Sequence, residues 1–240
     1  MVVSRKIFFY AAIITIFLFI SIYSLNLYMN NQRENFVLDR MEQILDEYQE
    51  LQTLSIMSNA FGEEMTCLSL ENTLSHLDKT LWDTGIKIDR YREVTEQFVD
   101  DPFYIDQKRK FNRNEVVYLS MLENMKHVCD FNQTIILYFY KKKEDCKDCD
   151  AQAFVLTDLN KEIDEEIAIF SFDLNLELPS LKTLQVFYNI TSYPCIVVEN
   201  STYCGLLDKN QIEDILCDYR EHSICESQQE LNIRKAKLLK

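Results

Sequence analysis

The stretch "TIILYFYKKKEDCKDCDAQAF", Thr134–Phe154, decides how the distal part of the chain folds. It opens with a nearly continuous apolar run bounded by charge, which is typical of a strand buried on both faces. A charged loop follows, and then two cysteines, Cys146 and Cys149. This pair fits three interpretations, which are a redox pair, half of a metal site and a structural disulfide. The rest of the chain has to choose among them.

Downstream of the paired cysteines, helix-like and strand-like segments alternate. The predicted segments are, in chain order, a helix ending near Ile163, a strand at 166–174, a helix at 179–190, strands at 195–198 and 201–207, and a helix at 208–220. The predicted fold is therefore an α/β fold of order β-α-β-α-β-β-α. Its first two strands are expected to be parallel and its last two to form a hairpin. With Glu199-Asn200 as the turn, counting outward places Cys195 opposite Cys204.

The N-terminus contains a candidate membrane anchor. The uncharged run Ile7–Met29 is long enough, at ~1.5 Å per residue, to cross a hydrocarbon core of about 30 Å. Arg5 and Lys6 precede it, so the positive-inside rule places residues 1–6 in the cytoplasm and the bulk of the chain on the extracytoplasmic side. A cleavable signal peptide is the alternative. The run is long for such a peptide and lacks a clear small-residue cleavage site, so an uncleaved single-pass anchor is favoured.

Residues 30–130 are predicted to be helical. Apolar residues recur with a period of 3.5 at 37–51, 67–81 and 118–129, which indicates a small helical bundle or hairpin, with a coiled-coil dimer as the rival. Pro102 marks a helix start. Cys67 begins the second of these seams and Cys129 ends the third. Antiparallel helices would bring the two together, and either a disulfide or two buried thiols fits this arrangement.

The chain has eight cysteines, and their number and compartment favour disulfides over metal binding. No second Cys-x-x-Cys occurs, and the histidines are scattered at His76, His127 and His222, so we expect no metal site and no cofactor. Cys217 and Cys225 are candidates for a disulfide that ties the last helix to the tail.

The net charge of the chain bears on which classes of partner it can bind. Its net charge of −14 argues against a nucleic-acid partner, which would require a basic face. The tail at 226–240 is basic, and its simplest interpretation is a solvated helix end.

Three features together resemble the thioredoxin superfamily over roughly residues 131–220, and the resemblance implies a thioredoxin-like domain at 131–225. They are the Cys-x-x-Cys pair directly after the first strand, the Tyr193-Pro194 dipeptide before the third strand, and Gly205 between the last strand and the last helix. The chain departs from the family pattern at Asp145, where an aromatic residue is usual, and at Lys147-Asp148 inside the motif.

The resemblance implies roles for particular residues. It implies that Cys146 attacks, that Cys149 resolves the mixed disulfide, and that Pro194 is a cis-proline that shapes a substrate groove. It also implies that the backbone of Tyr193 pairs with an extended protein substrate. If Cys146 begins the helix, unpaired N–H groups and the helix dipole would lower the pKa of its thiol below about 8.5.

Two functions follow as expectations. The first is a membrane-anchored extracytoplasmic thiol–disulfide oxidoreductase that acts on protein substrates and is recycled by a membrane redox partner. The second is a non-catalytic thioredoxin-like interaction module whose cysteines are structural. Beside the proline, Cys195 also has two interpretations, as the disulfide partner of Cys204 or as a third redox thiol.

Overall fold

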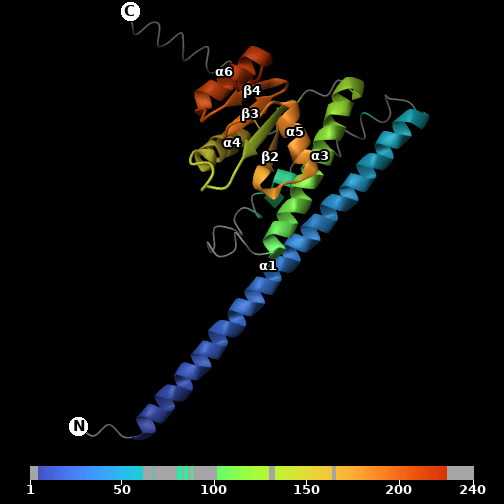
Figure 1. The fold of residues 1–240 in the computed structure, drawn as a ribbon. Helices are drawn as coiled ribbons and strands as arrows, with labels where there is room; N and C mark the ends of the chain where they lie inside the picture. The colour runs from blue at the N-terminus through green and yellow to red at the C-terminus, as the bar shows by residue number, and fades with distance from the viewer. Residues whose placement is uncertain are drawn as a thin grey trace, which may run out of the picture. The chain divides into compact units, whose positions relative to one another are not determined.

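The computed structural model describes residues 5–61, 67, 80–82, 84–85, 88, 102–129, 133–163 and 166–225 (Figure 1). The chain divides into two compact units, Met1–Ile44 and Leu45–Lys240. Most of the predicted seam at 67–81 and the whole basic tail at 226–240 lie outside the described residues, as do most of the side chains of the seam at 37–51.

The first element, α1 (Arg5–Phe61), contains the candidate membrane span. Its segment Phe8–Phe36 contains an 18-residue window with a mean hydropathy of 2.2, and by length and composition it could cross a membrane. Large apolar side chains such as Phe17 and Phe19 are exposed along it. The sequence predicted an anchor that ends at Met29, whereas the helix continues without a break to Phe61. The physical reason is the absence of any Gly or Pro between Arg5 and Phe61.

The helix α3 (Pro102–Cys129) begins at the predicted residue. Proline lacks a backbone N–H, and the first turn of a helix leaves that donor unused in any case, so Pro102 is well placed as the first helical residue. At the other end of α3, Cys129 is bonded to Cys67 with an S–S distance of 2.01 Å. Of the two arrangements that the seams allowed for these cysteines, the structure has the disulfide.

The distal part is a mixed four-stranded sheet with helices on both faces, so the predicted mixed α/β sheet is confirmed. Its elements are β1 (Thr134–Tyr140), α4 (Cys149–Ile163), β2 (Ile167–Asp173), the 3-10 turn η2 (Leu174–Leu176), α5 (Pro179–Phe187), β3 (Cys195–Val198), β4 (Ser201–Cys204) and α6 (Lys209–Tyr219). The strand order is β2-β1-β3-β4. β1 and β2 are parallel, and β3 is antiparallel to both β1 and β4.

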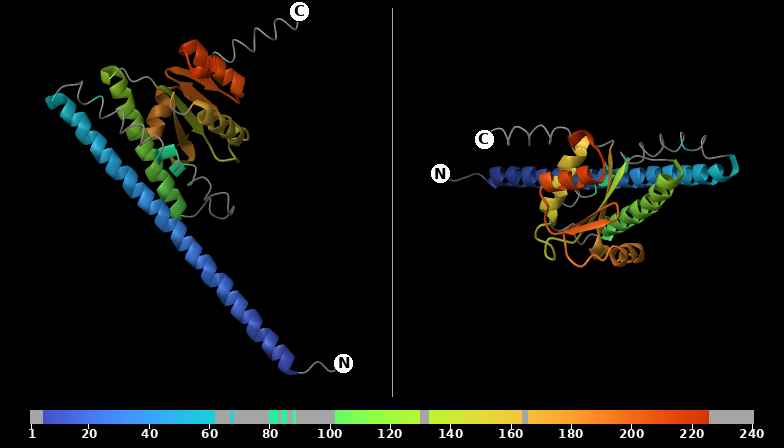
Figure 2. Two further views of the ribbon diagram at one scale, coloured as in Figure 1. Left: turned by 180° about the vertical axis from the view of Figure 1, so that it is seen from behind. Right: turned by 90° about the horizontal axis from the view of Figure 1, so that it is seen from above.

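Strand β1 is buried on both of its faces, which explains its continuous apolar run. On one face, Ile136 and Tyr138 pack in a cluster with residues of α4 and α6 such as Leu156 and Leu216. On the other face, Phe139 contacts Phe172 and the chain just after α5. Figure 2 shows α5 and the pair α4 and α6 on opposite sides of the sheet.

Strand β2 lies at one edge of the sheet, and α3 covers that edge. The N–H of Ser171 donates to Glu115 Oε1 at 3.0 Å, and the N–H of Asp173 donates to Asn112 Oδ1 at 2.9 Å. Asn112 Nδ2 in turn donates to the carbonyl of Ser171 at 3.4 Å. Side chains of a helix thus occupy hydrogen-bonding groups that an edge strand would otherwise leave open.

This contact bears on the domain division. The predicted division at residue 130, between α3 and the sheet, stays a prediction, and the compact unit Leu45–Lys240 includes both elements. The helix and the edge strand that it covers therefore belong to the same unit.

Candidate functional site

The loop that carries Cys146 leaves the carboxyl end of β1. The N–H groups of Asp145 and Cys146 both donate to the carbonyl of Lys142 at 2.9 Å, which forms a tight turn. Helix α4 then begins at Cys149, and Gln152 N–H donates to the carbonyl of Asp148 at 3.0 Å in its first turn. Cys146 therefore precedes the helix, so the condition that it begins the helix, on which the lowered pKa of its thiol depended, is not met. Its own N–H is already used by the turn that precedes α4.

Cys146 and Cys149 form a disulfide with a Cα–Cα distance of 5.5 Å. Cys146 is 5% exposed and Cys149 is 2% exposed, so both are buried and Cys146 is the more accessible of the two. The Tyr138 hydroxyl donates to the carbonyl of Cys149 at 2.6 Å, which ties the start of α4 to the sheet. The pair is thus in its oxidised form on a rigid strand–loop–helix support.

Tyr193 and Pro194 lie at the same end of the sheet as this loop. Phe139 is the register partner of Cys195 in the antiparallel pair, so the residue before Cys195 lies level with the end of β1. The Tyr193–Pro194 peptide bond is cis. Lys141 Nζ lies 4.9 Å from the centre of the Tyr193 ring. The structure therefore brings the predicted proline and the predicted cysteine pair to the same end of the sheet.

Two contacts fix this segment. Gly205 N–H donates to the carbonyl of Pro194 at 2.8 Å, and Gly205 has a φ of 106°, a left-handed value that favours glycine. The Tyr193 hydroxyl accepts a hydrogen bond from Gln185 Nε2 at 2.8 Å. Burial raises the pKa of the Tyr193 phenol, and the bond from Gln185 only partly offsets this, so the phenol is neutral at physiological pH.

The remaining cysteines are also in disulfides. Cys195 is bonded to Cys204, its register partner, with a Cα–Cα distance of 4.0 Å. Cys217 is bonded to Cys225 with a Cα–Cα distance of 5.7 Å. All eight cysteines lie in the described part of the chain, and none is a free thiol there. Cys195 is therefore in the cross-strand bond with Cys204 and is not a free thiol beside the Cys146–Cys149 pair.

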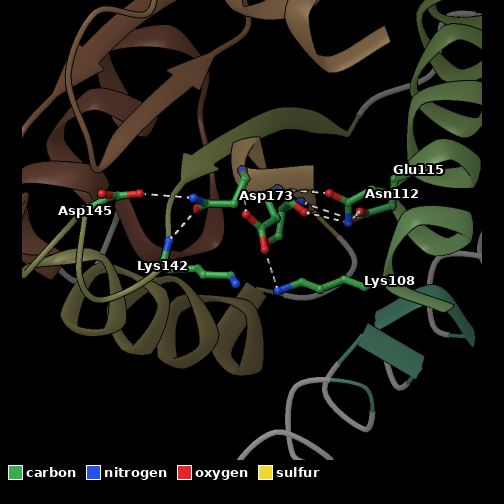
Figure 3. A network of polar contacts seen from close by, with 8 residues as sticks. Lys108, Asn112, Glu115, Lys142, Asp145 and Asp173 are labelled. Carbon is green, nitrogen blue, oxygen red and sulfur yellow. Dashed lines mark hydrogen bonds and ion pairs between the residues drawn. The ribbon is translucent and has the colours of Figure 1, made fainter. Parts of the chain in front are cut away.

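A polar network next to the loop was not predicted (Figure 3). Lys142 N–H donates to Asn175 Oδ1 at 2.7 Å, and Asn175 Nδ2 donates to Asp145 Oδ2 at 3.1 Å. The N–H of Asn175 donates to Asp173 Oδ1 at 2.9 Å, and Asp173 Oδ2 is paired with Lys108 Nζ at 2.8 Å. The signal that could have found it is the pair of short polar side chains in "FDLN", at the carboxyl end of β2 and just beyond it, where the ends of parallel strands meet.

An apolar cavity of about 130 Å³ adjoins Cys149, between α3, α4 and the sheet. Aromatic side chains form much of its wall, including Phe111, Tyr118 and Tyr138. Among the residues that the structure describes, no group of three or more His, Cys, Asp or Glu side chains is arranged to hold a metal ion.

Comparison with known proteins finds similar solved structures among the thioredoxins. Thioredoxin-2 of the malaria parasite, described as a component of its protein secretion machinery, is 22% identical over 36% of this chain and 84% of that chain, with a TM-score of 0.32. Chloroplastic thioredoxin z is 23% identical over 41% of this chain and 87% of that chain, with a TM-score of 0.33. A malarial protein is 21% identical over 36% of this chain and 97% of that chain, with a TM-score of 0.32. No family model and no curated protein matches the chain.

Proposed function

We propose that this chain is a membrane-anchored thiol–disulfide oxidoreductase with a thioredoxin-like domain, which exchanges disulfides with extracytoplasmic protein substrates through Cys146 and Cys149. The observation that carries the proposal is the disulfide between these two residues, in the segment that joins β1 to α4. This segment lies at the end of the sheet where Tyr193-Pro194 also lies. A structural disulfide alone does not require a proline segment beside it. The anchor within α1 would keep the enzyme at the membrane, where a membrane redox partner would recycle it.

The exchange balances without a cofactor. Starting from the oxidised pair, a substrate thiolate attacks the sulfur of Cys146, and Cys149 leaves as a thiolate. A second substrate thiolate then attacks the substrate sulfur of this mixed disulfide, and Cys146 leaves as a thiolate. The substrate gains a disulfide and the pair becomes a dithiol. The reverse sequence reduces a substrate disulfide, with Cys146 as the attacking thiolate.

The test is a turnover assay on the full-length chain in detergent micelles. Wild type is expected to reduce insulin in the presence of a thiol donor or to refold a scrambled disulfide protein, and C146S is expected to abolish this activity. C149A is expected to accumulate mixed disulfides with substrate through Cys146. The double variant C217A/C225A removes a disulfide away from the site and is the matched control, which should retain activity. Absence of turnover in wild type would reject the enzymatic proposal.

A second candidate function is a non-catalytic interaction module. The observation that favours it is the burial of both cysteines in the closed, oxidised loop, together with the charged Asp145 where the family usually has an aromatic residue. The reduction potential of the Cys146–Cys149 pair separates the candidates. A value near about −120 mV indicates an oxidant, near about −270 mV a reductant, and below about −300 mV a structural disulfide.

A further inference from the structure

Hydrogen bonds from within the Cys146 loop and from outside it hold its turn. Within the loop, the carbonyl of Lys142 accepts the N–H groups of Asp145 and Cys146. From outside the loop, Asn175 contacts both ends of the same turn, since its Oδ1 accepts from Lys142 N–H at 2.7 Å and its Nδ2 donates to Asp145 at 3.1 Å. One amide side chain thus bridges the residue where the turn starts and the residue directly before Cys146.

Asn175 is itself held from behind. It lies in η2, and its N–H donates to the carboxylate of Asp173 at 2.9 Å, which caps that turn. The other oxygen of Asp173 is paired with Lys108 of α3, and the two side chains are only 4% and 6% exposed. Removing one member of a buried ion pair leaves the other charge buried without its partner, which strongly destabilises the fold. The pair with Lys108 therefore holds Asp173 in place behind Asn175.

We propose that Asn175 is a positioning residue for the Cys146–Cys149 pair, which holds the Cys146 loop in the shape that favours the disulfide and ties that loop through Asp173 and Lys108 to α3. This inference rests on the proposed function, because a positioning residue serves catalysis only if the pair exchanges disulfides. The expected effect itself is on the equilibrium between the dithiol and the disulfide of Cys146 and Cys149.

The direction of the effect follows from preorganisation. Holding both ends of the turn limits the positions of the Cys146 sulfur in the reduced protein, which raises its effective concentration at Cys149. A higher effective concentration favours ring closure to the disulfide. Loss of the Asn175 bridge should therefore make the pair easier to reduce, that is, raise its reduction potential.

The first measurement uses N175A in the full-length chain. We expect the equilibrium constant for disulfide formation to fall about tenfold, which corresponds to a rise of ~30 mV for this two-electron couple. The protein is equilibrated in dithiothreitol redox buffers, and the state of Cys146 and Cys149 is read by differential alkylation and mass spectrometry. The matched control is N210A, the same substitution at an exposed asparagine in the first turn of α6, which should leave the equilibrium unchanged within twofold.

The second measurement restores the bridge with its groups exchanged. N175D places a second carboxylate beside Asp145 and should make the pair easier to reduce. In the double variant N175D/D145N, the new amide at position 145 can donate to the new carboxylate at position 175, whose other oxygen still accepts from Lys142. This double variant has the net charge of wild type, and its equilibrium constant should return to within about twofold of the wild-type value.

The outcomes distinguish this inference from the proposed function. An unchanged equilibrium in N175A, or no recovery in N175D/D145N, would overturn the positioning role even if the enzyme turns over insulin. A purely structural role would lower the free energy of unfolding of N175A and leave the reduction potential of the pair in place, so it too is excluded by the expected shift. Conversely, a wild-type potential below about −300 mV would reject the proposed enzyme, while a shift in N175A would still establish the positioning role.

Discussion

The two edges of the sheet are protected in different ways. At the β2 edge, α3 supplies Asn112, Glu115 and the buried Lys108–Asp173 pair. At the β4 edge, the strand is short and mostly exposed, and it is fastened to its inner neighbour by the Cys195–Cys204 bond. Short strands and covered strands are both ways to prevent edge-to-edge pairing. The β2 edge therefore depends on a noncovalent contact between distant segments, whereas the β4 edge depends on a local covalent bond.

The largest expected effect is at the β2 edge. K108A leaves the carboxylate of Asp173 buried without its ion-pair partner, so we expect a loss of about 3–5 kcal/mol in the free energy of unfolding, measured by urea titration. The control is K110A, which removes an exposed lysine of the same helix from its pair with Asp106 and should cost less than about 0.5 kcal/mol. Equal losses for the two variants would show that the buried pair does not stabilise the edge.

The β4 edge is tested by C195A/C204A. The bond closes a short loop, with a sequence separation of 9, so the chain-entropy model predicts a loss of about 2–3 kcal/mol in the free energy of unfolding. Added dithiothreitol should not destabilise the variant further through this site. If the variant is as stable as wild type, the hairpin holds this edge without its disulfide, and the contrast between the edges disappears.

A smaller effect is expected for N112A at the β2 edge. The substitution leaves the N–H of Asp173 and the carbonyl of Ser171 without their side-chain partner, which costs about 2 kcal/mol of unfolding free energy. Amide hydrogen exchange gives a second measurement, because the N–H of Asp173 should lose protection while the amides of β4 keep theirs. S201A on the exposed face of β4 is the control and should change stability by less than about 0.5 kcal/mol.

The smallest expected effect depends on pH and concerns Glu166, just before β2. Burial raises the pKa of this carboxyl, but hydrogen bonds from Ser223 and His222 outweigh burial, so its pKa is lowered from 4.5. Because the folded pKa is below the unfolded value, the stabilisation is present above about pH 4.5 and is lost as the pH falls through the folded pKa. The carboxylate is partly exposed, so solvent screening limits the effect to about 1 kcal/mol or less.

The measurement for Glu166 compares wild type with E166Q in urea titrations at pH 7 and at pH 3. Wild type should lose more stability than E166Q between these two pH values, because only wild type contains the titrating carboxyl. A larger loss in the variant would mean that the hydrogen bonds from residues 222 and 223 do not stabilise the charged form.

Local patterns were sufficient for much of the sheet. The apolar run of β1 indicated a buried strand, and counting outward from the Glu199-Asn200 turn gave the register that places Cys195 opposite Cys204. The contact of α3 with β2 could not be predicted in this way. Asn112 and Glu115 bond to backbone groups 61 and 56 residues away, and a polar side chain that bonds to a distant backbone leaves no periodic signal.

The candidate site divides along the same line. The Cys-x-x-Cys spacing indicated Cys146 and Cys149, the resemblance to the thioredoxin superfamily implied Pro194, and the structure brings the three to one end of the sheet. The sequence did not set the exact start of α4, since the turn that takes up the N–H of Cys146 depends on loop geometry rather than on composition. Asn175 was missed because its side chain bonds to Lys142 and Asp145, which lie 33 and 30 residues earlier in the chain.

The bond between Cys67 and Cys129 closes a ring with a sequence separation of 62. A protease that cuts once between these two cysteines would produce two fragments that stay joined in one covalent molecule. The fragment with α1 would keep its link to the fragment with the sheet until the bond is reduced. A cut between Phe61 and Cys67 would instead leave α1 and the sheet in two fragments that no disulfide joins, so the position of a single cleavage decides whether the two stay covalently linked.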